Sequence, residues 1–168
     1  MLGKKRNSNA FVLFVALVVI AAVLLVRGYA SAKTIFDFTQ DTTEMDNINL
    51  RYEPGPVLYL SNGCQGIRMG ITSDQAFSIR EVLANDMFSR PLTHDLVFET
   101  FSAFNIKLVY AKIDAIKDGI YTAKLLFSDN TLYYEADSRP SDMAAFTLRY
   151  RNKFAISNSL ASNMTNVC

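Results

Sequence analysis

Hydrophobic residues form one uninterrupted run near the start of the chain, Ala10–Val26, in which all 17 residues are apolar. At ~1.5 Å per residue a helix of this length measures about 26 Å, close to the ~30 Å hydrocarbon thickness of a bilayer. Arg27 can extend its charged end to the interface, so that Gly28 to Ala32 complete the span. The run predicts a transmembrane helix. We disfavour the alternative, a buried core helix, because no polar face interrupts the run.

The next stretch, residues 33–53, is polar and weakly patterned. It predicts a linker, in which Thr34 to Phe38 can add one edge strand. Two short apolar runs follow between turn residues, Val57 to Leu60 and Ile67 to Ile71. They predict a β-hairpin.

Apolar residues recur at helical spacing in three later segments, each preceded by a residue that can cap a helix. The expected helices are Asp74 to about Met87 after Thr72 or Ser73, a helix capped by Thr93 and stopped by Asn105, and a helix from the cap Ser141 to about Arg151.

Between the second and third helices the apolar period changes to two, which is the period of a strand. Lys117-Asp118-Gly119 and Ser128-Asp129-Asn130 divide this region into three segments, which predict an antiparallel meander. The expected inward rows are Val109, Ala111 and Ile113; Tyr121, Ala123, Leu125 and Phe127; and Leu132, Tyr134 and Ala136.

The order of these elements predicts an α+β fold, in which helices cover one face of a mostly antiparallel sheet. Phe154 to Ser157 supplies a last short strand. We therefore expect a membrane segment at residues 1–32, a polar linker at 33–53, one domain at 54–157 and a flexible tail at 158–168.

The charges that flank the apolar run predict its orientation. Lys4, Lys5 and Arg6 precede it, and acidic residues follow it, which places the N-terminus in the cytoplasm and the domain outside. Ala30-Ser31-Ala32 has the form of a signal-peptidase site, so cleavage after Ala32 and secretion are the alternative. We favour a retained anchor, because the apolar run exceeds the usual length of a signal peptide's apolar region.

Beyond Ala32 the chain carries 13 basic and 16 acidic residues, a net charge of −3. Proteins that hold duplex DNA tightly neutralise phosphates with clustered Lys and Arg, and no such cluster follows Lys33. Any contact with nucleic acid is therefore expected to be local and weak. Cys64 and the terminal Cys168 can form one disulfide outside the cytoplasm, although nothing in the sequence brings them together.

Two polar runs concentrate the potentially reactive side chains at expected helix starts, Arg90 to Leu96 and Glu135 to Ala145. The first contains the only histidine, His94, which can serve as a general base or acid. Arg139 can bind a phosphate through two hydrogen bonds. The carboxylates that can join this site are Asp95, Asp137 and Asp142, of which Asp137 and Asp142 are the expected ligands of Mg²⁺ or Mn²⁺.

Capping explains most of the same residues without catalysis. Thr93 and Ser141 would cap their helices, Asp95 and Asp142 would favour the positive helix ends, and Arg139 would pair with either acid. His94 is the residue that exceeds what capping requires.

The two polar runs, together with Ile71 to Ala76 and Asp118 to Ala123, resemble the bifunctional nuclease family in content and order. The resemblance extends over about Pro56 to Ser157. It implies an α+β domain with divalent-metal-dependent cleavage of DNA and RNA. Gln75 stands where this family usually carries a glutamate.

The resemblance leads us to expect a membrane-anchored domain that hydrolyses phosphodiesters with a divalent metal, with His94, Asp95, Arg139 and Asp142 as catalytic residues. The alternative is a catalytically silent, membrane-tethered binding or oligomerisation module on the same fold. We also expect a homo-oligomer, such as a dimer.

Overall fold

The computed structural model describes residues 8–85 and 90–168, with side chains from residue 12. The chain divides into an N-terminal unit that ends at Phe38 and a second unit from Thr39 to Cys168. The expected end of the helix that begins at Asp74, near Met87, lies outside the described residues.

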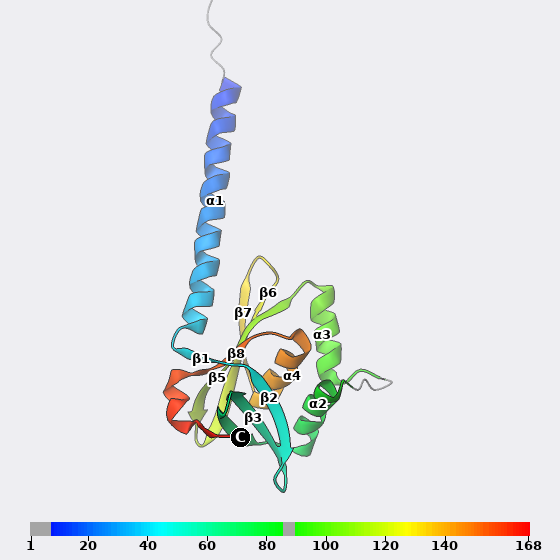
Figure 1. The fold of residues 1–168 in the computed structure, drawn as a ribbon. Coiled ribbons are helices and arrows are strands. Elements are labelled where there is room, and N and C mark those ends of the chain that lie inside the picture. Colours follow the sequence, from blue (N-terminus) through cyan, green and yellow to red (C-terminus); the bar gives the residue numbers. More distant parts are fainter. Residues whose placement is uncertain (1–7, 86–89) are drawn as a thin grey trace, which may run out of the picture. The chain divides into compact units, whose positions relative to one another are not determined.

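One long helix, α1 (Ser8–Thr39), makes up the described part of the N-terminal unit (Figure 1). Its segment Val12–Thr39 is long enough to cross a membrane and contains an 18-residue stretch with a mean hydropathy of 2.6. The helix continues through Lys33, whose ammonium contacts Asp37 at 2.7 Å one turn later. The prediction of an edge strand at Thr34 to Phe38 was wrong, because local hydrogen bonds and ion pairs continue the helix there.

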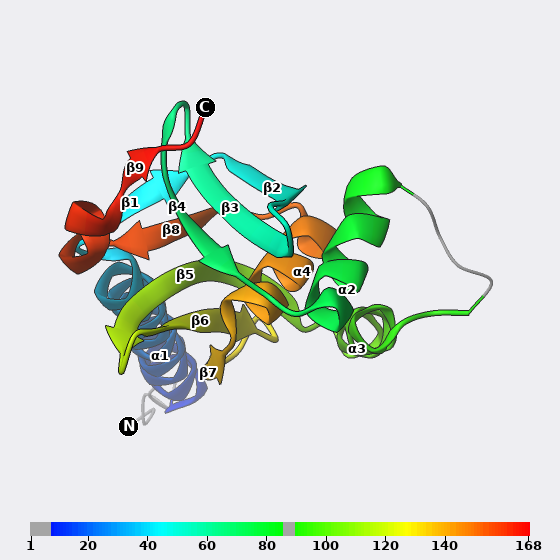
Figure 2. The ribbon, with the colours of Figure 1, turned by 90° about the horizontal axis from the view of Figure 1, so that it is seen from below.

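The second unit contains two sheets (Figure 2). The five-stranded sheet has the order β1 (Thr42–Met45), β8 (Phe154–Ser157), β5 (Lys107–Lys117), β6 (Ile120–Ser128) and β7 (Tyr133–Ser138). The four-stranded sheet has the order β2 (Asn47–Tyr52), β3 (Pro56–Asn62), β4 (Gln65–Gly70) and β9 (Thr165–Asn166). Apart from β5 and β8, which are parallel, neighbouring strands are antiparallel.

Both the hairpin β3–β4 and the meander β5–β6–β7 were predicted from the sequence. The prediction that residues 33–53 form an unstructured linker was also wrong for its second half, because β1 pairs with β8 and β2 pairs with β3. Met45 and Ile48 are buried in the core, which explains why this otherwise polar stretch is ordered. Isolated apolar residues between polar ones gave little sign of this in the sequence.

The inward row of β5 differs from the simple alternation. Register shifts between Leu108 and Tyr110 and between Ile113 and Ala115 interrupt the pairing with β6, so that Leu108, Ala111 and Ile113 enter the core. A bulge inserts an extra residue and displaces Val109 from the row. In β7 only Ala136 of the expected row packs against the core, whereas Leu132 and Tyr134 are exposed.

Three helices complete the domain: α2 (Ser73–Ala84), α3 (Thr93–Ala103) and α4 (Pro140–Tyr150). Helix α4 lies against β5 and β6, and α2 and α3 pack against α4 (Figure 2). This places the starts of three helices on one side of the five-stranded sheet. The predicted α+β class is confirmed.

The caps of these helices were predicted with mixed success. Thr72 caps α2, and Gln75 completes a capping box by accepting a hydrogen bond from the Thr72 N–H at 2.9 Å. Leu92, and not Thr93, precedes α3, and the Leu92 N–H donates to Asp95 at 2.8 Å. Arg139 precedes α4, and Pro140 takes the first helical position, so Ser141 lies inside the helix.

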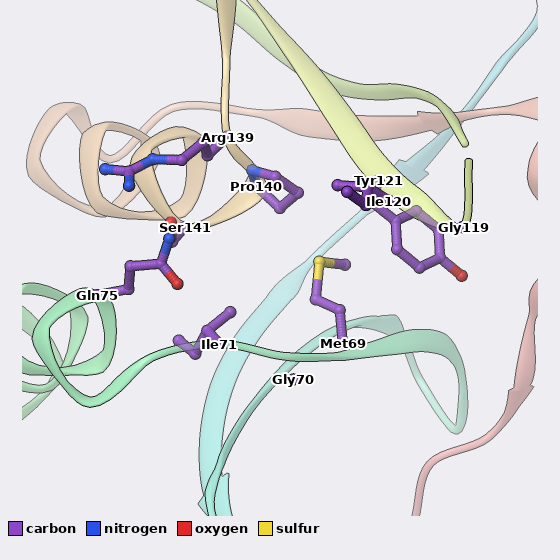
Figure 3. A pocket seen from close by; sticks show the side chains of 10 residues that line it. All are labelled: Met69, Gly70, Ile71, Gln75, Gly119, Ile120, Tyr121, Arg139, Pro140 and Ser141. Atoms are coloured by element: carbon purple, nitrogen blue, oxygen red, sulfur yellow. The ribbon is translucent and has the colours of Figure 1, made fainter. Parts of the chain in front are cut away.

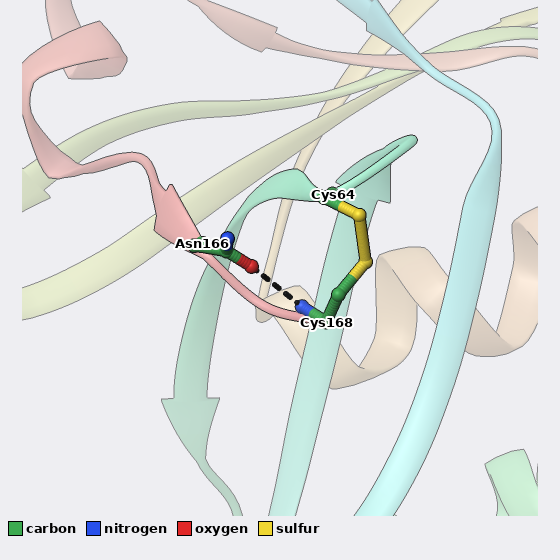
Figure 4. The surroundings of a disulfide bond; sticks show 3 residues. All are labelled: Cys64, Asn166 and Cys168. Carbon is green, nitrogen blue, oxygen red and sulfur yellow. Dashed lines mark hydrogen bonds between the residues drawn. A yellow bond between two sulfur atoms is a disulfide. The ribbon is translucent and has the colours of Figure 1, made fainter.

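The expected flexible tail is folded. A 3₁₀ helix (Asn158–Asn163) and β9 lead the chain end to β4, where the Val167 N–H donates to the Cys64 carbonyl at 2.9 Å. Cys64 and Cys168 form a disulfide with a Cα–Cα distance of 5.1 Å (Figure 4). The short strand β9, too brief to be seen in the sequence, brings the two cysteines together.

Candidate functional site

His94 and Asp142 meet although they come from different polar runs. His94 lies in the first turn of α3 and Asp142 in the first turn of α4, and the His94 Nε2 is 3.2 Å from the Asp142 Oδ1. Each side chain is 21% exposed. The sequence predicted both residues for one site, and the packing of α3 against α4 brings them into contact.

Arg139 completes this group. Its Nε donates to the Asp142 Oδ2 at 2.7 Å, and its Nη2 donates to the Asp142 Oδ1 at 3.0 Å. The guanidinium is thus held in a fork against the carboxylate, and its Nη1 group makes no hydrogen bond to a described residue. A solvent-exposed guanidinium held in this way can still bind an anion.

The other ring nitrogen of His94 is also engaged. The His94 Nδ1 is 3.0 Å from the Ser78 Oγ, and the Arg149 Nη2 donates to the same oxygen at 3.2 Å. Because Asp142 only accepts hydrogen bonds, it assigns the proton of a neutral His94 ring to Nε2. Ser78 then donates to Nδ1, and neither ring nitrogen is left free for a substrate in this arrangement.

Asp95 takes part in a second ion pair, with Arg149. The Arg149 Nε donates to the Asp95 Oδ1 at 2.7 Å, while the Leu92 N–H occupies Oδ2. The Arg149 side chain is 5% exposed, and its Nη1 donates to the Ala145 carbonyl at 3.0 Å. Asp95 therefore connects α3 to α4 through Arg149, and it forms no hydrogen bond or ion pair with Arg139 or Asp142.

These contacts perturb two carboxyl groups. Burial by itself would raise the pKa of Asp142, but the hydrogen bonds from His94 and Arg139 outweigh it and lower this pKa to about 2. Burial likewise opposes ionisation of Asp95, but the hydrogen bonds from Arg149 and the Leu92 N–H keep the pKa of Asp95 below its usual range. Both groups are carboxylates at neutral pH.

Asp137 lies apart from this group. It is exposed on β7 and faces Lys124 of β6 in the register. Within residues 8–85 and 90–168, no three His, Cys, Asp or Glu side chains gather as a metal would require. Both oxygens of Asp142 already accept hydrogen bonds from His94 and Arg139, so the described side chains show no assembled divalent-metal site, and we derive no step through one.

A pocket of about 370 Å³ is lined in part by Arg139 (Figure 3). Its polar wall comes from the helix starts, with Gln75, Arg139 and Ser141. Its other wall comes from β4 and the β5–β6 turn and is mainly apolar: Met69, Gly70, Ile71, Gly119, Ile120 and Tyr121 line it with Pro140. The Ser141 hydroxyl is buried and makes no hydrogen bond to a described residue.

The sequence missed Ser78, Arg149 and Ser141 as members of this site. Ser78 and Arg149 lie in the middle and at the end of their helices, where nothing in the local pattern separates them from ordinary helix residues. Ser141 was assigned to capping. Its position directly after a proline indicated that Ser141 lies inside the first turn of the helix and is not the cap.

Residues 57–166 of the chain match the bifunctional nuclease domain. Two Mycobacterium tuberculosis proteins, both described as uncharacterized, are similar to the chain: MT1877 of strain CDC 1551 / Oshkosh and Rv1829 of strain ATCC 25618 / H37Rv. Each is 32% identical over 96 residues, which cover 56% of this chain. The aligned part covers 57% of each relative, so the chain spans little more than half the length of these relatives.

Proposed function

Because the chain belongs to the bifunctional nuclease domain family, we propose that its domain hydrolyses phosphodiester bonds of DNA or RNA at the pocket beside Arg139. The observation that carries this proposal is the joint presence of a held guanidinium and a pocket at the start of α4. The first N–H groups of a helix favour a bound anion, and Arg139 adds a positive charge at the same place.

The residues around the pocket have distinct roles in this proposal. Arg139 binds the phosphate and stabilises the charge that develops during cleavage, while Asp142 and His94 hold the guanidinium in position. His94 can exchange a proton near neutral pH, but its Nε2 must first leave Asp142 and turn to the substrate. The expected requirement for Mg²⁺ or Mn²⁺ stays a prediction.

The test is a cleavage assay on the full chain in detergent, with single-stranded DNA and RNA, in Mg²⁺, in Mn²⁺ and in EDTA. Arg139→Ala should lower cleavage by ~10²-fold or more, the effect of removing one transition-state donor. Arg68→Ala is the matched control, since Arg68 is an exposed arginine on β4 outside the pocket. Equal losses in both variants, or no cleavage by the unaltered chain, would refute the proposal.

The catalytically silent alternative is favoured by one observation: His94, Asp142, Ser78 and Arg149 connect α2, α3 and α4 through hydrogen bonds. If these contacts serve only stability, His94→Ala should lower the free energy of unfolding by ~1–3 kcal/mol without a separate loss of activity. If the domain is a nuclease, His94→Ala should lower cleavage by ~10²-fold at conditions where the variant remains folded.

We also propose that α1 is a retained membrane anchor with the N-terminus in the cytoplasm and the domain outside. Lys4, Lys5 and Arg6 before the apolar run support the orientation. The Cys64–Cys168 disulfide supports it independently, because disulfides persist in oxidising compartments and are rare in the cytosol.

A further inference from the structure

The five-stranded sheet exposes different side chains at its two ends. The β5–β6 turn lies at one end, together with Ile120 and the pocket. The residues that follow α3, the start of β5 and the β6–β7 turn lie at the other end (Figure 1). The nine residues of β6 connect the two ends, a separation of roughly 26 Å at ~3.3 Å per residue.

The end remote from the pocket carries large exposed apolar side chains. Phe104, directly after α3, is 71% exposed, and Leu132, in the β6–β7 turn, is 59% exposed. Tyr134 and Lys107 are exposed beside them at the same end of the sheet. We call Phe104, Leu132 and Tyr134 the apolar tip. Aromatic, aliphatic and lysine side chains in this combination are typical of a membrane interface.

Three backbone N–H groups of the β6–β7 turn, those of Asn130, Thr131 and Leu132, donate hydrogen bonds within the turn. The Asp129 carboxylate accepts hydrogen bonds from the N–H groups of Thr131 and Leu132, both at 2.8 Å, and from the Tyr134 hydroxyl at 3.0 Å. The Asn130 N–H donates to the Ser128 hydroxyl at 3.1 Å. These N–H groups therefore need no water when the turn approaches the bilayer interface, while the charged Asp129 keeps the turn at the hydrated headgroup level.

We propose that the apolar tip inserts into the interface of the phospholipid bilayer that holds α1. This inference rests on the proposed membrane anchoring and goes beyond it, because it assigns an orientation to the domain. The anchor keeps the domain at a high effective concentration near lipid, so that a few apolar side chains suffice for docking. The pocket lies at the opposite end of the sheet, so docking through the tip leaves the pocket uncovered by lipid.

The chain contains no tryptophan, so a single introduced tryptophan is a specific reporter. The variants are Phe104→Trp and Leu132→Trp, with Ile120→Trp as the matched control, since Ile120 is 69% exposed in the turn at the opposite end. The full chain is placed, one copy per disc, in phosphatidylcholine nanodiscs whose acyl chains carry bromine. Insertion should quench roughly half of the emission at Phe104→Trp and Leu132→Trp, and leave Ile120→Trp unquenched by lipid.

Three results would overturn the proposal: equal quenching at all three positions, no quenching at either tip position, or tip tryptophans that are shielded from aqueous acrylamide but not quenched by lipid. The last result would show that protein, and not lipid, covers the tip. Failure of anchoring is separate, because the chain would then not incorporate into the discs at all.

Discussion

At the scale of single residues, the candidate site is held together by charged groups whose hydrogen-bonding capacity is largely used. His94 has both ring nitrogens engaged, and Asp142 has both oxygens engaged. Such a network connects the middle of α2 to the starts of α3 and α4. Among the described residues, the donors that Arg139 leaves unused are the two N–H groups of its Nη1 and one N–H of its Nη2. Binding of an anion requires no rearrangement of the network, whereas proton transfer by His94 does.

The cap of α3 offers a direct test at this scale. Asp95→Ala should lower the free energy of unfolding by about 2 kcal/mol, because it removes the acceptor of the Leu92 N–H and leaves the buried guanidinium of Arg149 without its carboxylate partner. Thr93→Ala should change the free energy of unfolding by less than about 0.5 kcal/mol, because Thr93 is exposed and is the first residue of α3, not its N-cap. Urea unfolding measures both, and a larger loss for Thr93→Ala would restore the threonine as the cap.

The lowered pKa of Asp142 predicts a specific acid sensitivity. The pKa is about 2 in the folded domain, below that of an unfolded aspartate near ~3.9. The carboxylate therefore contributes its full stabilisation above about pH 4, and this is lost as the pH falls toward about 2. The contribution is on the order of 2 kcal/mol. Urea unfolding between about pH 5 and about pH 2 should show a shallower decline for Asp142→Asn than for the unaltered chain; parallel declines would contradict this origin.

At the scale of elements, the sequence predicted those parts of the fold in which many neighbouring residues follow one period. The meander β5–β6–β7 and helices α2, α3 and α4 have such patterns, and they position His94, Arg139 and Asp142. Strands β1, β2 and β9 do not, because each is short or interrupted by polar residues, and each is ordered by pairing with a strand far away in the sequence. Their order comes from tertiary contacts that no local pattern records.

The same limit applies to the site. Residues at helix starts were found because capping and reactive side chains share those positions. Arg149 was not found, since its role depends on the packing of α4 against both α2 and α3. The pocket at Ile120 and Tyr121 also required the register of β5 and β6, which a bulge shifts.

The order of the chain end predicts a large contribution from the disulfide. Cys64 and Cys168 are 104 residues apart, and closing a loop of this length restricts the unfolded chain by up to ~4–5 kcal/mol. The double variant Cys64→Ser, Cys168→Ser should lower the free energy of unfolding by about 3 kcal/mol and loosen the pairing of β9 with β4. Denaturant unfolding and hydrogen exchange at Val167 measure the two effects. The unaltered chain under reducing conditions should behave like the variant, and a stable reduced chain would contradict the prediction.

At the scale of the whole molecule, the two units have different features. Helix α1 has the length and composition of a membrane span, and the second unit carries every described residue of the candidate site. The net charge of −3 beyond Ala32 indicates that affinity for nucleic acid would come from the pocket and not from a general basic surface. The affinity of this domain for nucleic acid should therefore fall less steeply with salt concentration than the affinity of a strongly basic protein does.

The topology of the whole chain is the last prediction. With basic residues before the apolar run and a disulfide in the domain, protease added outside intact cells, or to spheroplasts where a second membrane exists, should remove the domain and leave α1 in the membrane fraction. Changing Lys4, Lys5 and Arg6 to glutamine should weaken this orientation, because the positive charges determine which end stays in the cytoplasm. Arg27 and Lys33 would then lie next to the run as its remaining basic residues. A domain protected from protease in the unaltered chain, with α1 still in the membrane, would reverse the orientation. A domain released into the medium without protease would instead indicate cleavage after Ala32. The domain would then have no membrane anchor, and the proposed docking of the apolar tip would be ruled out.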